Sequence, residues 1–84
     1  MRPQEASVNL DHDRIDSAVL ALLHLGLHEG ARAWKSFDWD AMSRLHEKGF
    51  ISNPVGKAKS VTFTESGLRE SERLLHELFA KAGP

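Results

Sequence analysis

The 84-residue sequence contains no cysteine. Neither a disulfide framework nor a thiolate zinc site is therefore available to stabilise it. A chain of this length forms one domain, because two hydrophobic cores could not be filled from so few residues. Such a domain has a thin margin of stability, so we expect it either to pack a few long helices well or to form a dimer.

Long apolar runs are also missing. No stretch approaches the roughly 20 apolar residues that a membrane-spanning helix needs, and residues 1–9 lack the basic-then-apolar order of a signal peptide. Together with the lack of cysteine, these absences predict a cytoplasmic protein without a membrane partner. The formal net charge of −1 excludes a strongly cationic nucleic-acid binder but allows a local basic patch.

The order of apolar and turn-forming residues predicts a mainly α domain with one β-hairpin, an α+β fold. The first ten residues are expected to be a flexible tail, and residues 11–84 to form the single domain. The first helix begins at Asp11 or Asp13, since either side chain can cap it. It is predicted to end near Leu27, beside Gly26, because glycine favours the end of a helix.

A second helix, a hairpin and a third helix follow. The second helix is predicted over residues 38–48, and Gly49 ends it in the left-handed conformation. Residues 50–52 and 59–64 favour two short strands around a loop with proline and glycine. Val61 and Phe63 are expected to face inward. Thr64 then caps the last helix. Its predicted apolar stripe consists of Leu68, Ser71, Leu75, Leu78, Phe79 and Ala82.

Two short motifs flank the hairpin. The second helix ends in Leu-His-Glu-Lys-Gly-Phe-Ile (residues 45–51), and Thr-Glu-Ser-Gly (residues 64–67) opens the last helix. This half of the chain resembles winged-helix regulators of the MarR and PadR types. Nearly the whole chain, including AWKSFDWDAMSRLHEKGFIS, also resembles a family of small uncharacterised bacterial proteins with no assigned activity. The resemblance implies a winged-helix-like fold, with a shortened helix-turn-helix because too few residues separate Leu27 from Asp38 for a full helix.

A local basic patch makes DNA a candidate partner. Four cations in residues 41–62 are candidate nucleic-acid contacts: Arg44, Lys48, Lys57 and Lys59. That segment holds a single acid, so its net charge is +3, and contact with phosphates requires such a concentration. Against this, Asp40 and Glu47 are predicted to share the exposed helix face with Arg44, and acids repel phosphates. The alternative is a solvated surface of mixed charge.

Three large aromatic residues lie within six positions: Trp34, Phe37 and Trp39. In the surrounding residues 29–37, apolar residues show no clear helical or strand periodicity. The segment is therefore predicted to form either a short helical turn or a brief strand. Exposed rings could stack on bases or anchor a protein interface. Buried rings would instead close one end of the small core. Trp34 and Trp39 are therefore candidate interface residues, with a role in the core as the alternative.

The first helix is apolar over more than half of its circumference. One face is predicted to meet the core through Ile15, Ala18, Val19, Leu22, Leu25 and Gly26. Leu20, Leu23 and Leu27 form a second stripe, displaced by about 100°. Burying a leucine is worth about 1.5–3 kcal/mol, so we expect this stripe to be covered. Either other parts of the same chain cover it, or it is the interface of a homodimer.

Catalytic and metal-binding motifs are missing. The sequence has no G-x-S-x-G, no glycine-rich phosphate loop and no H-E-x-x-H, so we expect no enzyme and no cofactor. His24 and His28 have i, i+4 spacing, but two ligands do not make a metal site. No small-molecule ligand is evident. The sequence favours a regulatory or adaptor domain that binds itself, as a homodimer, or another protein, with a winged-helix DNA-binding regulator as the alternative.

Overall fold

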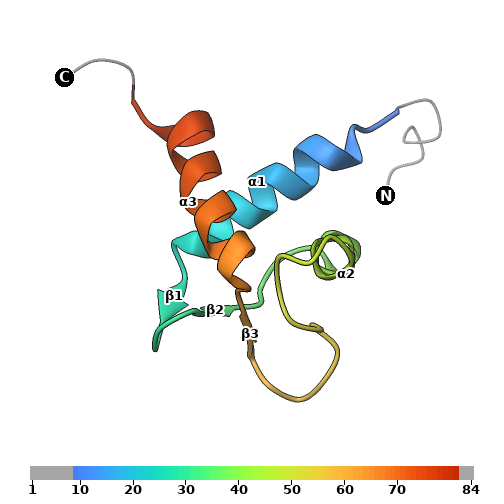
Figure 1. Ribbon diagram of the computed structural model, residues 1–84. Coiled ribbons are helices and arrows are strands. Elements are labelled where there is room, and N and C mark those ends of the chain that lie inside the picture. The colour runs from blue at the N-terminus through green and yellow to red at the C-terminus, as the bar shows by residue number, and fades with distance from the viewer. Residues whose placement is uncertain (1–8, 82–84) are drawn as a thin grey trace.

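Three helices and a small antiparallel sheet make up the fold in the computed structural model, which describes residues 9–81 (Figure 1). The helices are α1 (His12–His24), α2 (Trp39–Glu47) and α3 (Glu65–Phe79), and the strands are β1 (Leu27–His28), β2 (Arg32–Trp34) and β3 (Ser60–Thr62). The strands lie in the order β1-β2-β3. The predicted α+β class is confirmed, and the arrangement is compatible with a winged-helix-like fold. Most of the predicted tail, residues 1–8, lies outside the described residues.

Each helix begins at a side-chain cap. Asp11 accepts a hydrogen bond from the Arg14 amide at 3.1 Å, and Asp38 does the same for Ala41 at 3.1 Å. The Thr64 hydroxyl accepts from the Gly67 amide at 3.0 Å. These contacts satisfy amide groups that have no partner inside the helix. None of the helices in residues 9–81 is long and apolar enough to cross a membrane.

The first helix is shorter than predicted. It ends at His24, because the chain turns back and Leu27 pairs with Ala33 in the sheet. Glu29 and Gly30 form the tight turn between β1 and β2, both with positive φ (43° and 77°). Of the two alternatives predicted for residues 29–37, the brief strand is the one observed, as β2.

The two motifs around the hairpin meet in space. Gly49 adopts the predicted left-handed conformation, with φ +83°. Thr64 donates its hydroxyl to the Gly49 carbonyl at 2.6 Å and its amide to the Phe50 carbonyl at 2.9 Å. A Cβ atom on Gly67 would lie 1.9 Å from the Phe50 carbonyl oxygen. The first turn of α3 therefore packs directly on the backbone that leaves α2, and only glycine fits at position 67.

The core lies where α1 meets α3, α2 and the sheet. Its buried apolar residues are Val19, Leu20, Ala21, Leu23, Ala33, Ala41, Met42, Leu45, Ile51, Val61, Phe63 and Leu74. Val61 and Phe63 face inward as predicted. The prediction that Leu25 faces the core is wrong: it is 69% exposed, because the helix has already ended and Leu25 forms its C-terminal cap.

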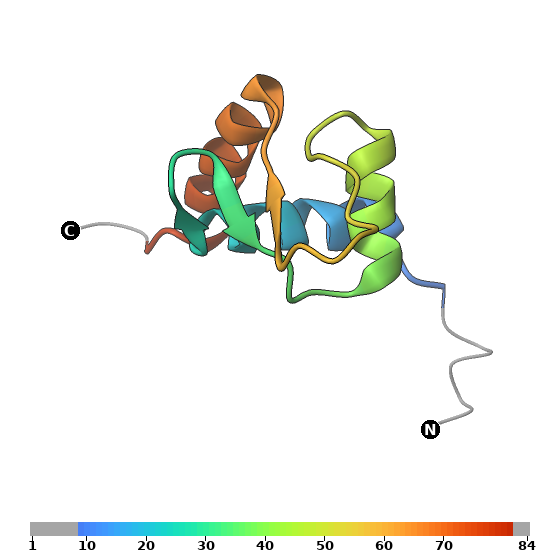
Figure 2. The same cartoon turned by 90° about the horizontal axis from the view of Figure 1, so that it is seen from below.

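Helices cover only one face of the sheet. Figure 2 shows the three strands in front of α1, with no helix over their outer face. α1 and α3 touch along one side and diverge, as Figure 1 shows, so that the end of α3 and the start of α1 lie apart. Within residues 9–81, the outer face of the sheet is thus left without a helix over it.

Candidate functional site

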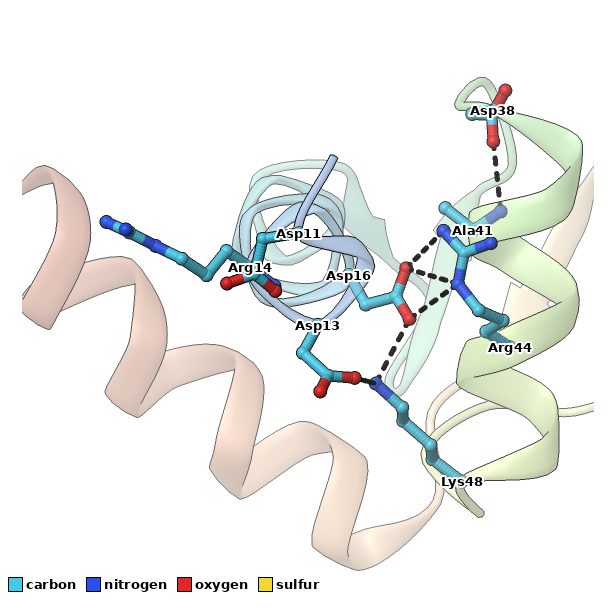
Figure 3. Close-up of polar contacts among 8 residues, drawn as sticks. All are labelled: Asp11, Asp13, Arg14, Asp16, Asp38, Ala41, Arg44 and Lys48. Atoms are coloured by element: carbon cyan, nitrogen blue, oxygen red, sulfur yellow. Dashed lines mark hydrogen bonds and ion pairs between the residues drawn. The ribbon is translucent and has the colours of Figure 1, made fainter. Parts of the chain in front are cut away.

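A buried carboxylate joins α1 to α2. Asp16 is 1% exposed and accepts hydrogen bonds on both oxygens from the Arg44 Nε atom, at 3.0 and 2.8 Å. The Arg44 Nη2 atom donates a further bond of 2.8 Å, and the Lys48 Nζ atom one of 3.0 Å. Lys48 also reaches Asp13 at 3.3 Å. Figure 3 shows Arg44 of α2, and Lys48 at the C-terminal cap of that helix, directed at the carboxylates of α1.

The charges of this cluster stabilise one another. Burial alone would raise the pKa of Asp16, but the hydrogen bonds from Arg44 and Lys48, with their positive charge, hold it below its ordinary value. The pKa of Lys48 is raised, because its bonds to Asp16 and Asp13 outweigh the effect of burial. Asp16 is therefore ionised at neutral pH, and the cluster is an internal ion pair network.

This network corrects the prediction that Arg44 and Lys48 contact DNA. Arg44 was expected on the exposed face of the helix, but its guanidinium is bound to a buried acid. Lys48 is bound to the same acid and to Asp13. The charged side chains left on the open face of α2 include Asp40 and Glu47, and these repel phosphates. A signal in the sequence was overlooked: Asp16 lies on the same helix face as Leu20 and Leu23, with i, i+4 and i+7 spacing.

The loop between Ile51 and β3 carries the other two predicted DNA contacts. Lys57 and Lys59 are both exposed. The loop itself is held in place by Lys35, whose Nζ atom donates to the carbonyls of Pro54 (2.5 Å) and Gly56 (3.2 Å). Pro54 is buried. The structure thus places two cations on a supported loop, apart from the ion pair network.

The predicted leucine interface is wrong for two of its three members. Leu20 is 1% and Leu23 0% exposed, because α2, α3 and the sheet of the same chain cover them. Leu27 is partly buried in β1. These leucines could contact a second copy only if the domain unfolded. The predicted alternative, that other parts of the same chain cover the stripe, therefore applies.

The aromatic segment is split between core and surface. Phe37 packs against the core, whereas Trp34 and Trp39 are about half exposed. Trp34 stacks on His28 with ring centroids 4.0 Å apart and an angle of 23° between the planes. A Cβ atom added at Gly26 would lie 3.6 Å from the Trp34 indole, so the ring lies beside this glycine. Both tryptophans are thus accessible, as an interface role requires.

A groove of about 510 Å³ lies between α1 and α3. Its lining consists of Arg14, Ser17, Ala18, Arg73, Leu74, Glu77, Leu78 and Phe79. Leu78 and Phe79 belong to the predicted apolar stripe of α3, yet they are 44% and 50% exposed. The first half of that stripe is covered by α1, but the helices diverge before the second half. Ala82, the last predicted member, lies outside the described residues.

Residues 11–81 match the model of a family described as a domain of unknown function, DUF6429. The chain belongs to this family. It is also similar to the uncharacterized protein y4hR of Sinorhizobium fredii (strain NBRC 101917 / NGR234), with 53% identity over 74 residues, 88% of this chain and 100% of that protein. No solved structure matches the chain. The predicted relation to a small family of unknown function is confirmed, whereas the MarR and PadR pattern remains a resemblance.

Two histidines of this DUF6429 domain form hydrogen bonds with serine side chains. His24 Nδ1 lies 2.8 Å from the hydroxyl of the buried Ser71, and His28 Nε2 lies 2.9 Å from the Ser60 hydroxyl. His28 belongs to β1, so the helical spacing predicted for His24 and His28 does not occur. Within residues 9–81, no group of three or more histidine, aspartate or glutamate side chains is placed to hold a metal ion.

Proposed function

We propose that this DUF6429 domain is a non-enzymatic regulatory or adaptor module that acts by binding protein, and that it forms a homodimer. The observation that carries the proposal is the groove between α1 and α3, with Leu78 and Phe79 half exposed on its wall. Adjacent exposed apolar side chains beside a hollow are typical of protein interfaces. A domain of this size also gains stability from burying such a surface in a dimer.

A second copy suits this groove because the same surface supplies both the hollow and the groups that would fill it. In a two-fold symmetric contact, Phe79 of each copy enters the groove of the other. The groove also carries charges of both signs. Arg14 extends from α1 toward α3 (Figure 3), and no ion pair of its side chain is found within residues 9–81. Glu77 is the acid on the α3 wall of the groove.

Sedimentation equilibrium tests the dimer. We expect a reversible monomer–dimer equilibrium for the wild type and a shift to monomer for Phe79→Glu, because the new charge would be buried without a partner. Leu25→Glu is the matched control: Leu25 is at least as exposed but lies outside the groove, so this variant should dimerise like the wild type. A wild type that stays monomeric at its highest soluble concentration would contradict the proposal.

Duplex DNA is the second candidate partner, and the observation in its favour is the pair of exposed lysines, Lys57 and Lys59. The ion pairs of Arg44 and Lys48 count against duplex DNA as a partner. With these two cations bound to acids, α2 would have to contact DNA through a face that carries Asp40 and Glu47. If duplex binding occurs, it should fall steeply with salt and disappear in the double variant Lys57→Glu/Lys59→Glu. No binding to duplex at low salt would exclude this candidate.

A further inference from the structure

The outer face of the sheet carries an exposed aromatic ring in a fixed position. Ala33 points into the core, so Arg32 and Trp34 on either side of it point outward. Trp34 pairs with Ser60, and Arg32 with Thr62, across the β2–β3 ladder. No helix of residues 9–81 covers this face (Figure 2), and Trp34, at the end of β2, is 51% exposed.

Contacts within the sheet hold these side chains in place. His28 stacks on one side of Trp34 and is itself oriented by the Ser60 hydroxyl at 2.9 Å. Arg32 forms an ion pair of 2.9 Å with Glu29 in the β1–β2 turn. A ring that is backed by another ring on one side and open on the other loses little freedom when a flat ligand stacks on it.

Positive charge is concentrated in the sheet and its loop. The sheet and its loop, residues 27–36 and 50–64, contain four cations and one acid, a net charge of +3. The cations are Arg32, Lys35, Lys57 and Lys59. The other residues of the range 9–81, mostly in helices, sum to −4. Lys59 directly precedes Ser60, the residue opposite Trp34, so an exposed cation and the exposed ring belong to the same end of the sheet.

We propose that this face binds single-stranded nucleic acid, with Trp34 stacking on a base and Lys57 and Lys59 contacting phosphates. Proteins that bind single strands without sequence preference combine an aromatic ring, on which a base stacks, with cations that contact the phosphates. A duplex hides the flat faces of its bases, so it could not use Trp34 in this way. It would instead require a helix in its groove, and the open face of α2 carries Asp40 and Glu47.

Fluorescence of Trp34 tests the proposal directly. In Trp39→Phe, Trp34 is the single tryptophan, and its emission should be quenched to saturation by short oligothymidylate or oligouridylate at low salt. Comparing the two oligomers distinguishes DNA from RNA. Labelled-oligomer anisotropy should show that Trp34→Leu binds about 5- to 150-fold more weakly, the effect of losing one stacked base. Each Lys→Ala change at Lys57 or Lys59 should lower the salt slope by about 0.7.

Two controls keep the result interpretable. Trp34→Phe retains a ring and should bind more tightly than Trp34→Leu, while circular dichroism checks that both variants are folded. Lys81→Ala removes an exposed cation far from the sheet in sequence and should leave the affinity unchanged. Unquenched Trp34 emission at low salt, equal losses in Trp34→Leu and Trp39→Phe, or tighter binding to duplex than to single strand would each overturn the proposal.

Discussion

Asp16 in α1 receives three hydrogen bonds from the guanidinium of Arg44 in α2, 28 residues later in the chain. The contact fixes how the two helices are placed relative to each other, since a buried carboxylate and its cation tolerate little displacement. It also removes Arg44 from the surface on which a DNA-binding helix would need it. One ion pair thus affects both the stability of this domain and the choice between its functions.

Replacing Asp16 by asparagine should destabilise the domain by about 2–3 kcal/mol, because two cations would lose their buried acid. We place the loss at or just below the lower end of the range for buried ion pairs, since Arg44 and Lys48 are partly accessible to water. Urea unfolding measures it. Asp13→Asn is the control, because Asp13 is exposed and should contribute under about 1 kcal/mol. Equal losses in the two variants would contradict the assignment.

The contribution of Asp16 should depend on pH in a defined direction. Its folded pKa lies below the ordinary value, so the unfolded chain takes up this proton first as the pH falls. The stabilisation is complete above about pH 4, the unfolded pKa, and is lost as the pH falls through the folded pKa. The difference in unfolding free energy between wild type and Asp16→Asn should be constant near neutral pH and shrink below about pH 4. A constant difference throughout would show that another group is responsible.

Alanine at position 67 should be destabilising even though it favours helices. Its Cβ atom would meet the Phe50 carbonyl oxygen at 1.9 Å, which forces the start of α3 away from the end of α2. We expect a net loss of about 1–3 kcal/mol and a lower melting temperature. Gly26→Ala is the matched control, because its Cβ would meet its nearest neighbours at 3.5–3.6 Å, an ordinary contact. If the Gly67→Ala variant were as stable as Gly26→Ala, position 67 would not pack directly against the Phe50 backbone.

The placement of the leucines in α1 can be tested by truncation. Leu20→Ala should cost about 2–5 kcal/mol, because it leaves a cavity in the core. Leu25→Ala should change stability by no more than about 0.5 kcal/mol, since Leu25 is largely exposed. Chemical denaturation at low protein concentration separates these effects from dimerisation. If Leu20→Ala lowered the unfolding free energy only slightly, Leu20 would not be a core residue, and the interface role predicted from the sequence would apply.

Lys35 should control the opening of the loop that carries Lys57 and Lys59. Lys35→Met keeps the apolar stem but removes the donor to the Pro54 and Gly56 carbonyls. A loss of about 1 kcal/mol in local stability would raise the open population about fivefold. Trypsin cleavage after Lys57 and Lys59 should accelerate accordingly, with Lys81→Met as the unchanged control. An unaltered cleavage rate would show that the loop is held by the packing of Pro54 alone.

Local signals in the sequence were sufficient for much of the fold. The capping role of Thr64, the left-handed turn at Gly49 and the inward direction of Val61 and Phe63 were all predicted correctly. Each depends on residues within a few positions along the chain, through a side-chain cap, a permitted φ angle or strand alternation. Membership in a small family of unknown function also followed from the sequence.

The candidate sites depended on contacts between distant segments, which only the tertiary structure decided. The helical pattern showed that Leu20 is apolar, but whether α3 or a second chain covers it depends on how the helices cross. The pattern placed Arg44 on a polar face, but its partner Asp16 belongs to another helix. The divergence of α1 and α3 likewise exposed Phe79, which periodicity alone placed in an apolar stripe. Without cysteine, this domain relies on such packing and ion pairs between its helices, and they leave the groove and the outer face of the sheet open for binding.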